Sequence, residues 1–257
     1  MHLELHPTLA EFAVDNPTPS HTHIGCAGWS IPKEFADRFP VAGSHLERYA
    51  ERFPAVEINT SFYRPHRPAT YARWAQSVPD GFRFAVKMPQ EVTHERRLVD
   101  MGDVLDRFIS EATQLGSKLG PILVQLPPSL PFSAKVAETF LTALRDRFAG
   151  EVALEPRHTS WFTAIPERLM TEFRVARVAA DPAVTPPAAE PGGWDKLVYY
   201  RLHGSPRTYY STYSHKCLEA LSLKLLKRAP RAVVWCIFDN TAEGAATLNG
   251  LDLLDLG

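Results

Sequence analysis

Eight short runs of β-forming residues recur along the chain, and most are followed by a longer stretch whose apolar residues return at three- and four-residue steps. This alternation is typical of parallel strands joined by crossover helices. The predicted strand segments are 23–30, 55–62, 82–89, 121–128, 151–158, 174–182, 196–204 and 232–240. Predicted helical segments include 43–53, 68–78, 104–120, 133–148 and 215–229. Eight strands in 257 residues, with no GxGxxG turn, favour an α/β fold of the single (β/α)8 TIM-like barrel type over an open doubly wound sheet.

Two segments depart from this regular pattern. The sixth crossover, residues 181–195, is rich in Pro and Ala and is incompatible with a normal helix, which predicts an irregular barrel at this point. Residues 1–21 have neither a basic start nor an unbroken apolar run and are expected to form a loosely ordered N-terminal arm. We therefore expect one TIM-like barrel domain over residues 22–257.

Polar side chains interrupt the strands on one face. In the second strand Glu57 and Asn59 oppose Val56 and Ile58, and because side chains alternate across a strand, the polar pair is expected to point inward. The same alternation places further polar residues inward near the carboxyl ends of other strands: Lys87, Gln125, Glu155, Arg157, Arg177, Asp181, Arg201, His203 and Asn240. For any one residue a purely structural ion pair explains the pattern equally well. The polar residues, however, come from five strands and lie at the end of the barrel that carries active sites in such folds. Together they favour a functional site.

Composition narrows the function classes. With 45% hydrophobic and 22% charged residues and a formal net charge of -1, the chain has the composition of a soluble globular protein without a basic field for nucleic acid. The three cysteines, Cys26, Cys217 and Cys236, have no CxxC spacing, which favours a reducing compartment over a disulfide or zinc framework. No run of eighteen apolar residues occurs. We expect a cytoplasmic protein that does not bind membranes.

The charged residues predict an enzyme of the hydrolase or lyase type that acts on a small anionic or phosphorylated substrate. Opposite charges close together keep a general base ionised and polarise a bound carbonyl or phosphate. The candidate catalytic residues are Glu57 or Glu155 as base, Lys87 or His203 as acid or electrostatic stabiliser, and Asp181. The candidate substrate-binding residues are Trp29, Asn59, Phe62, Tyr63, Gln125, Arg157, His158, Trp161, Arg201, Gly204, Tyr213, Asn240 and Thr241.

The loops after the last two predicted strands have two interpretations, a phosphate-binding site or an ordinary capped helix. The last two loops of such barrels frequently hold phosphate, and here Arg201, His203 and Arg207 precede a helix start near Thr241. A plain helix capped by Thr241 explains the same residues, and Ser214 is expected to cap the preceding helix.

Two other functions fit parts of the sequence. A metal-dependent, nuclease-like phosphodiesterase would use Glu57, Glu155, Asp181, His94, His158 and His203 as ligands. The chain has no HExxH or HxH spacing, and its inward cations repel a metal, so we expect no metal and no cofactor.

A non-enzymatic binder of single-stranded nucleic acid is the other alternative, because the loops that follow the strands mix basic and aromatic residues.

Several motifs resemble those of a known family. GCAGWS, VEINTSFYRP, FAVKMPQEVTH, LVQLPPS, LEPRHTSW, YYRLHG and FDNT look like successive motifs of domain of unknown function 72, the YecE-like proteins, from about Ile24 to Leu254. The resemblance implies a TIM-like barrel but no established reaction; roles proposed for the family rest on similarity to metal-dependent barrel nucleases and on suspected nucleic-acid binding. The family often has Asn where this chain has Asp239. By alternation, Asp239 is expected to point away from the interior if Asn240 points in.

Overall fold

The computed structural model describes residues 22–256 of the chain, so the arm predicted for residues 1–21 lies outside the described residues. The strands of this part are β1 (Thr22–Cys26), β2 (Ala55–Ile58), β3 (Arg83–Lys87), β4 (Leu119–Gln125), β5 (Val152–Glu155), β6 (Val175–Arg177), β7 (Ala179–Asp181), β8 (Gly192–Gly193), β9 (Leu197–Leu202) and β10 (Val233–Phe238). Its α-helices are α1 (His45–Ala50), α2 (Pro68–Gln76), α3 (Gly102–Ala112), α4 (Ala134–Arg145), α5 (Ala164–Glu172), α6 (His215–Arg228) and α7 (Ala245–Leu254). Each predicted strand segment contains a strand, and the sixth contains two.

The strands are divided between two sheets. One sheet has the order β1-β10-β9-β7 and is parallel throughout; the other has the order β2-β3-β4-β5-β6-β8 and is parallel except for the β6–β8 pair. A single bridge between Ala27 and Glu57 links β1 to β2. On the other side, only Val178 separates β6 from β7, and its amide donates to the Leu154 carbonyl of β5. The predicted α/β class is confirmed, with two sheets in place of one continuous sheet.

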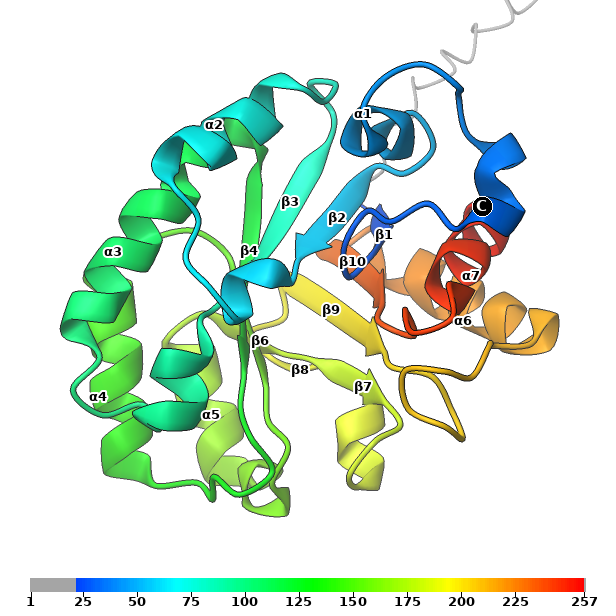
Figure 1. Ribbon diagram of the computed structural model, residues 1–257. Coiled ribbons are helices and arrows are strands. Elements are labelled where there is room, and N and C mark those ends of the chain that lie inside the picture. The colour runs from blue at the N-terminus through cyan, green and yellow to red at the C-terminus, as the bar shows by residue number, and fades with distance from the viewer. Residues whose placement is uncertain (1–21, 257) are drawn as a thin grey trace, which may run out of the picture.

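The helices lie outside the strands. Figure 1 shows α2, α3, α4 and α5 on one side of the strands, and α1, α6 and α7 on the other. Helix α3 buries Val104, Leu105 and Phe108 on one face, as its amphipathic sequence requires. Helix α6 begins at the predicted cap: the Ser214 hydroxyl accepts a hydrogen bond from the Cys217 amide at 3.4 Å. No helix within residues 22–256 is both long enough and apolar enough to span a membrane.

A separate hydrophobic cluster is enclosed between the strands. Its buried members are mostly small or flat: Ala55, Ala85, Leu123, Ala153, Ala176, Val178, Leu197, Tyr199, Trp235 and Ile237. The Trp235 and Tyr199 rings stack with centroids 6.0 Å apart. A Cβ on Gly120 would lie 2.4 Å from the Trp235 ring, so the absence of a side chain at this position makes room for the indole. These residues form an apolar floor beneath the polar groups nearer the carboxyl ends of the strands.

The sixth crossover is irregular, as predicted. The prediction that Arg177 points inward from the sixth strand segment is wrong. A 3-10 turn (Pro186–Ala189) and the short antiparallel strand β8 replace a crossover helix. Ala176 and Val178 point into the inner cluster, whereas Arg177 is bonded to Glu167 of α5 and to the carbonyls of Pro187 and Glu190. Alanine and valine fit the narrow interior, and the guanidinium finds its acceptors outside it.

Two predicted helix boundaries also need correction. Helix α7 begins at Ala245 and its N-cap is Gly244, at φ 79°, so the predicted cap at Thr241 is wrong and Thr241 is exposed. The third predicted helix is shorter than its apolar pattern suggested. The α-helix ends at Ala112, and a 3-10 segment, Thr113–Lys118, follows it with Gly116 in a non-helical conformation at φ 58°. Leu119 already begins β4.

Candidate active site

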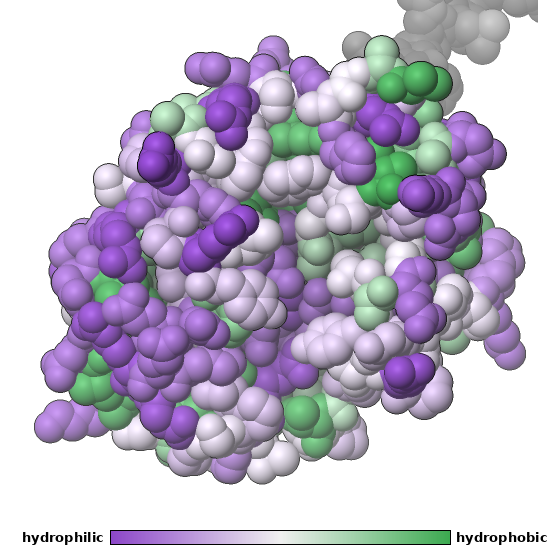
Figure 2. Space-filling view, viewed as in Figure 1, coloured by the Kyte–Doolittle hydropathy of each residue, from purple (hydrophilic) through white to green (hydrophobic). Residues whose placement is uncertain are grey.

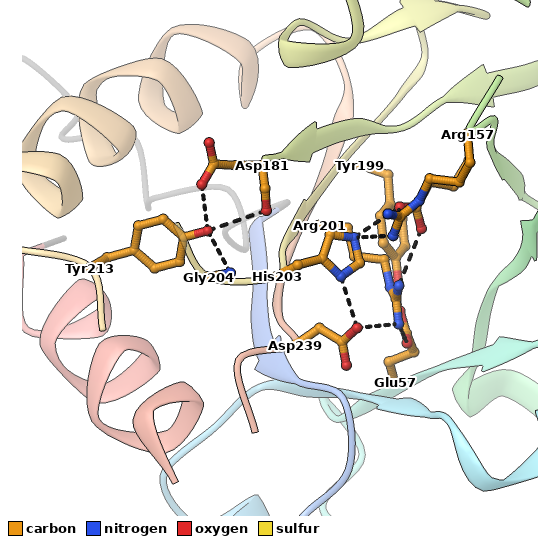
Figure 3. Close-up of polar contacts among 10 residues, drawn as sticks. Glu57, Arg157, Asp181, Tyr199, Arg201, His203, Gly204, Tyr213 and Asp239 are labelled. Atoms are coloured by element: carbon orange, nitrogen blue, oxygen red, sulfur yellow. Dashed lines mark hydrogen bonds and ion pairs between the residues drawn. The ribbon is translucent and has the colours of Figure 1, made fainter. Parts of the chain in front are cut away.

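A network of ionisable side chains lies at the carboxyl ends of five strands. Its members are Glu57 of β2, Lys87 of β3, Glu155 and Arg157 at the end of β5, Tyr199, Arg201 and His203 along and after β9, and Asp239 after β10. Figure 3 shows most of these side chains converging on Arg201 and His203. Figure 2 shows a recess with mainly hydrophilic colouring near the middle of the face seen in Figure 1.

Arg201 is the centre of the network. Its Nε and Nη2 donate to the two carboxylate oxygens of Glu57 at 3.0 and 2.8 Å, which is the bidentate geometry that suits a guanidinium best. Nη1 donates to Glu155 at 3.2 Å, and Nη2 also lies 3.1 Å from Asp239. The Tyr199 hydroxyl donates to Glu57 at 2.9 Å. A carboxylate is tolerated at position 57 of a buried strand because Arg201, from the other sheet, neutralises its charge.

His203 lies between two carboxylates. Its Nδ1 is 2.9 Å from Asp239 Oδ2, and its Nε2 is 2.9 Å from Glu155 Oε1. Arg157 Nη2 lies 2.7 Å from both His203 Nε2 and Glu155 Oε1. A neutral ring can donate from Nδ1 to Asp239 and accept from Arg157 at Nε2, whereas a protonated ring can donate to both carboxylates. In both arrangements Nδ1 donates to Asp239, so this carboxylate fixes the orientation of the ring.

The cations keep the buried carboxylates ionised. Burial by itself would raise the pKa of Glu155, but Arg157, His203 and Arg201 hold it well below its usual range. Burial would also raise the pKa of Asp239, but the stronger opposing effect of Arg201 and His203 lowers it. Burial alone would lower the pKa of Arg201, yet Asp239, Glu57 and Glu155 together raise it well above its usual value. Glu155, Asp239 and Arg201 therefore carry charge at neutral pH.

Lys87 differs from the other cations of the network. Its side chain is buried, and no carboxylate of residues 22–256 lies within 4.0 Å of its Nζ. The ammonium instead lies over the Phe62 ring, 4.0 Å from the centroid. Burial lowers the pKa of Lys87 to about 8 and Arg201 adds to the effect, although Glu57, Asp239 and Glu155 act in the opposite direction.

The chain's family follows from its full-length match. The model of the family described as "Protein of unknown function DUF72" matches residues 23–256. The chain belongs to the DUF72 family. This confirms the resemblance drawn from the motifs and, like that resemblance, brings no established reaction.

Curated relatives and solved structures of DUF72 proteins agree with this assignment. The UPF0759 protein YecE of Escherichia coli (strain K12) is 30% identical over 141 residues, which are 54% of this chain and 50% of YecE. YunF of Bacillus subtilis (strain 168) is 28% identical over 149 residues, 55% of this chain and 52% of YunF. The chain thus spans about half the length of the curated relatives it matches.

A DUF72 crystal structure from Enterococcus faecalis V583 has a TM-score of 0.78 at 23% identity, covering 91% of this chain and 94% of that one. One from Thermotoga maritima MSB8 has a TM-score of 0.74 at 23% identity, covering 91% and 98%.

Two members of the network were missed in the sequence of this DUF72 chain. Asp239 was expected to point away from the interior, but its carboxylate contacts Arg201 and His203. Asn240 is the residue that points away, donating to the Ser211 carbonyl and to Asn249 of α7. Alternation counted from the inward Trp235 and Ile237 would have found Asp239. Alternation does predict that Tyr199 shares the inward face of its strand with Arg201, but Tyr199 was not among the candidate site residues.

Asp181 belongs to a separate group. Its carboxylate accepts a hydrogen bond from the Tyr213 hydroxyl at 2.6 Å, and the same hydroxyl accepts one from the Gly204 amide at 2.9 Å. Figure 3 shows this group beside the main network, on the far side of the backbone that carries His203. The expectation that Asp181 faces the cations of the network is therefore wrong. Asp181 and Tyr213 line a cavity of about 540 Å³ between β7, β9 and α6.

The remaining candidate residues surround the network or lie apart from it. Phe62 packs under Lys87, exposed Tyr63 packs against Phe62, and Gln125 pairs in register with Glu155. Asn59 precedes the 3-10 turn that carries Phe62. The other candidates do not join the network: Trp29 packs on Trp74, His158 accepts from the Ser160 amide, and Trp161 is buried and donates to the Leu130 carbonyl.

The residues proposed for the metal and nucleic-acid alternatives are only partly brought together by the fold. Across residues 22–256, no group of three or more His, Cys, Asp or Glu side chains is arranged to hold a metal ion. Several basic loop residues are engaged within the chain: Arg96 pairs with Glu91 and Asp103, and Arg97 bonds to Ser129. The exposed pair Arg207 and Tyr210 stack on each other, with the guanidinium 3.7 Å from the ring centroid.

Proposed function

We propose that the protein is an enzyme of the hydrolase or lyase type that binds a small anionic substrate, a phosphate ester or a carboxylate, at the carboxyl ends of its strands. The observation that carries the proposal is Lys87, a buried ammonium with no carboxylate of residues 22–256 within 4.0 Å. A buried charge without a close counter-ion is costly, and an anion placed beside it removes that cost. Arg157, the most exposed guanidinium of the network at 15%, supplies a second cation able to grip the same anion.

The proposed chemistry is proton transfer by His203. Asp239 binds Nδ1 and thereby fixes the ring so that Nε2 faces Glu155 and Arg157. A bound anion that draws the Arg157 guanidinium to itself leaves Nε2 able to exchange a proton with the substrate, while Lys87 and Arg157 stabilise the developing negative charge. Glu57 and Glu155, the bases expected from the sequence, are committed to Arg201 and Arg157 and take positioning roles in this mechanism.

We infer further that the two sheets form one irregular (β/α)8 barrel and that residues 22–257 make one domain. The Ala27–Glu57 bridge and the short break at Val178 support this inference, because they join the edges of the sheets in sequential strand order. The ion pairs of Arg201 with Glu57 and Glu155 also cross from one sheet to the other.

Anion binding by matched lysine variants tests the proposal. Titration calorimetry with inorganic phosphate, sulfate and a panel of phosphomonoesters and carboxylates should give binding to the unsubstituted protein that weakens at least roughly tenfold in Lys87→Met. Lys227→Met removes an exposed lysine of α6 and should bind as the unsubstituted protein does. The proposal fails if none of these anions binds, or if both variants bind equally well. Any ligand found is then assayed for turnover in the unsubstituted protein and in His203→Gln.

A further inference from the structure

Lys87 and His94 meet at the same aromatic ring. Lys87 is the last residue of β3, and His94 lies a few residues later on a π-helical turn, Glu91–Glu95. Lys87 Nζ is 4.0 Å from the Phe62 centroid, and the His94 ring packs against Phe62 with centroids 5.0 Å apart at 84°. A single π-helical turn is rare and is frequently found at functional sites. The turn brings the His94 imidazole to the same aromatic ring as the Lys87 amine.

Both groups are held toward their neutral forms. Burial, with a contribution from Arg201, lowers the pKa of Lys87 to about 8. Burial also lowers the pKa of His94, and Lys87 and Arg97 lower it further. Relative to a lysine of ordinary pKa, the uncharged fraction of Lys87 near pH 7 is larger on the order of a hundredfold. The chain thus holds, on one aromatic ring, a lysine that loses its proton more readily than an ordinary lysine and an imidazole that favours its neutral form.

Lys118 is a contrasting lysine in the same protein. Its side chain is also largely buried, but its Nζ donates to the carbonyls of Ala75 and Val78 and lies 3.7 Å from Asp80. These acceptors satisfy an ammonium ion and hold it in place. Lys87, which lies over an aromatic ring, has no such acceptor among the contacts of residues 22–256. Burial alone therefore does not set Lys87 apart.

We propose that Lys87 is a nucleophile that condenses with an aldehyde or ketone carbonyl of the anionic substrate to form an imine, with His94 as the proton-transfer group. This inference rests on the proposed function and specifies its substrate class: a small anion that carries a carbonyl group. It also selects lyase chemistry, because an iminium ion withdraws electrons from a neighbouring C–C or C–H bond.

The reaction balances without an oxidant or reductant. His94 takes a proton from the Lys87 ammonium, and the freed nitrogen lone pair forms the C–N bond as the carbonyl π bond opens. The imidazolium gives that proton to the carbonyl oxygen, which becomes a hydroxyl. The nitrogen gives one proton to His94. The resulting imidazolium returns that proton to the hydroxyl, which leaves as water as the nitrogen lone pair forms the C=N bond. The product is an iminium cation over the Phe62 ring, where the ring face favours positive charge.

Reductive trapping with glyoxylate, the smallest anionic aldehyde, tests the inference. Sodium cyanoborohydride reduces the imine to a stable carboxymethyl amine, and peptide mass mapping locates the labelled lysine. We expect label on Lys87 at a rate roughly tenfold or more above that on buried Lys118 and exposed Lys227, increasing as the pH rises toward 8. Lys87→Arg should lose this label, and His94→Gln should lower the rate severalfold while phosphate still binds.

The two proposals fail in different ways. If phosphate binds and Lys87 is labelled no faster than Lys227, imine formation is wrong and the anion-binding enzyme stands. An unchanged labelling rate in His94→Gln removes His94 from the reaction. If neither phosphate nor any other tested anion binds the unsubstituted protein, the proposed function fails and this inference fails with it.

Discussion

Arg201 of β9 donates two hydrogen bonds to Glu57 of β2, at 3.0 and 2.8 Å, in a part of the molecule where neither side chain reaches solvent. The two strands belong to different sheets, so this pair joins the sheets through the interior. Breaking a buried ion pair by changing one partner is costly because the other charge stays buried. The pair is therefore expected to stabilise the folded protein, whatever its part in the chemistry of the site.

Arg201→Lys should destabilise the protein although it keeps the positive charge. A lysine ammonium cannot reproduce the two parallel bonds to Glu57 and also reach Glu155 and Asp239. We expect the free energy of unfolding, measured by urea denaturation, to fall by about 3 kcal/mol. Tyr199→Phe is the control, since it removes one hydrogen bond to Glu57 and should cost about 1 kcal/mol. A stability of Arg201→Lys equal to that of Tyr199→Phe would contradict a bidentate clamp.

Anion binding should be accompanied by proton uptake at Lys87. In the free protein its pKa is about 8, so at about pH 8.5 most of the amine is neutral. An anion bound beside it favours the ammonium and raises this pKa. Calorimetry of phosphate binding in buffers of different ionisation enthalpy should then report uptake of a fraction of a proton at that pH. Lys87→Arg should bind with little or no uptake, and equal uptake in both proteins would assign the proton to another group.

The sequence was sufficient for the strands and for most of the network. β-Rich runs located every strand of the two sheets within residues 22–256 except the two-residue β8, and alternation identified Glu57, Lys87, Glu155, Arg201 and His203 as the polar residues of a shared inner face. These positions are predictable because a buried carboxylate or guanidinium within an apolar strand requires a partner. The division into two sheets was not predictable, since it depends on hydrogen bonds around Val178 and Ala27 that leave no sequence pattern.

The errors came from choosing which face of a strand points inward. In the sixth strand the charged Arg177 was placed inward, but the narrow interior takes Ala176 and Val178, and Glu167 of α5 pairs with the arginine outside. After the last strand, Asn240 was placed inward and Asp239 outward. In both cases the apolar residues at alternate positions mark the inner face: Ala176 and Val178 in the sixth strand segment, and Trp235 and Ile237 in β10.

Acid should destabilise the protein through Glu155. Its folded-state pKa lies well below the ordinary value of 4.5, so the ionised carboxylate contributes stability above that pH. The contribution is lost as the pH falls from about 4.5 toward the folded-state pKa. The free energy of unfolding, measured across this range, should decrease less steeply in Glu155→Gln than in the unsubstituted protein.

Glu151→Gln provides the opposite control for acid stability. Burial raises the pKa of Glu151, so ionising this group costs stability as the pH rises through its ordinary value of 4.5. The unsubstituted protein regains that stability on acidification, and Glu151→Gln does not. The decrease in the free energy of unfolding should therefore be steeper in Glu151→Gln. Slopes that change in the same direction in both variants would show that the two carboxyls do not have the opposite shifts described.

Asp239→Asn should make Lys87 more reactive. The Asp239 carboxylate raises the pKa of Lys87, partly offsetting burial, and an amide of the same shape removes that charge. The pKa of Lys87 then falls, the neutral fraction at pH 7 grows, and glyoxylate labelling at that pH should accelerate severalfold. The matched variant is Asp181→Asn, whose carboxylate binds Tyr213 outside the network and which should leave the rate unchanged. Both variants are first compared by urea denaturation, so that labelling is measured on folded protein. A slower or unchanged rate in Asp239→Asn would mean that the Asp239 carboxylate does not control the protonation of Lys87.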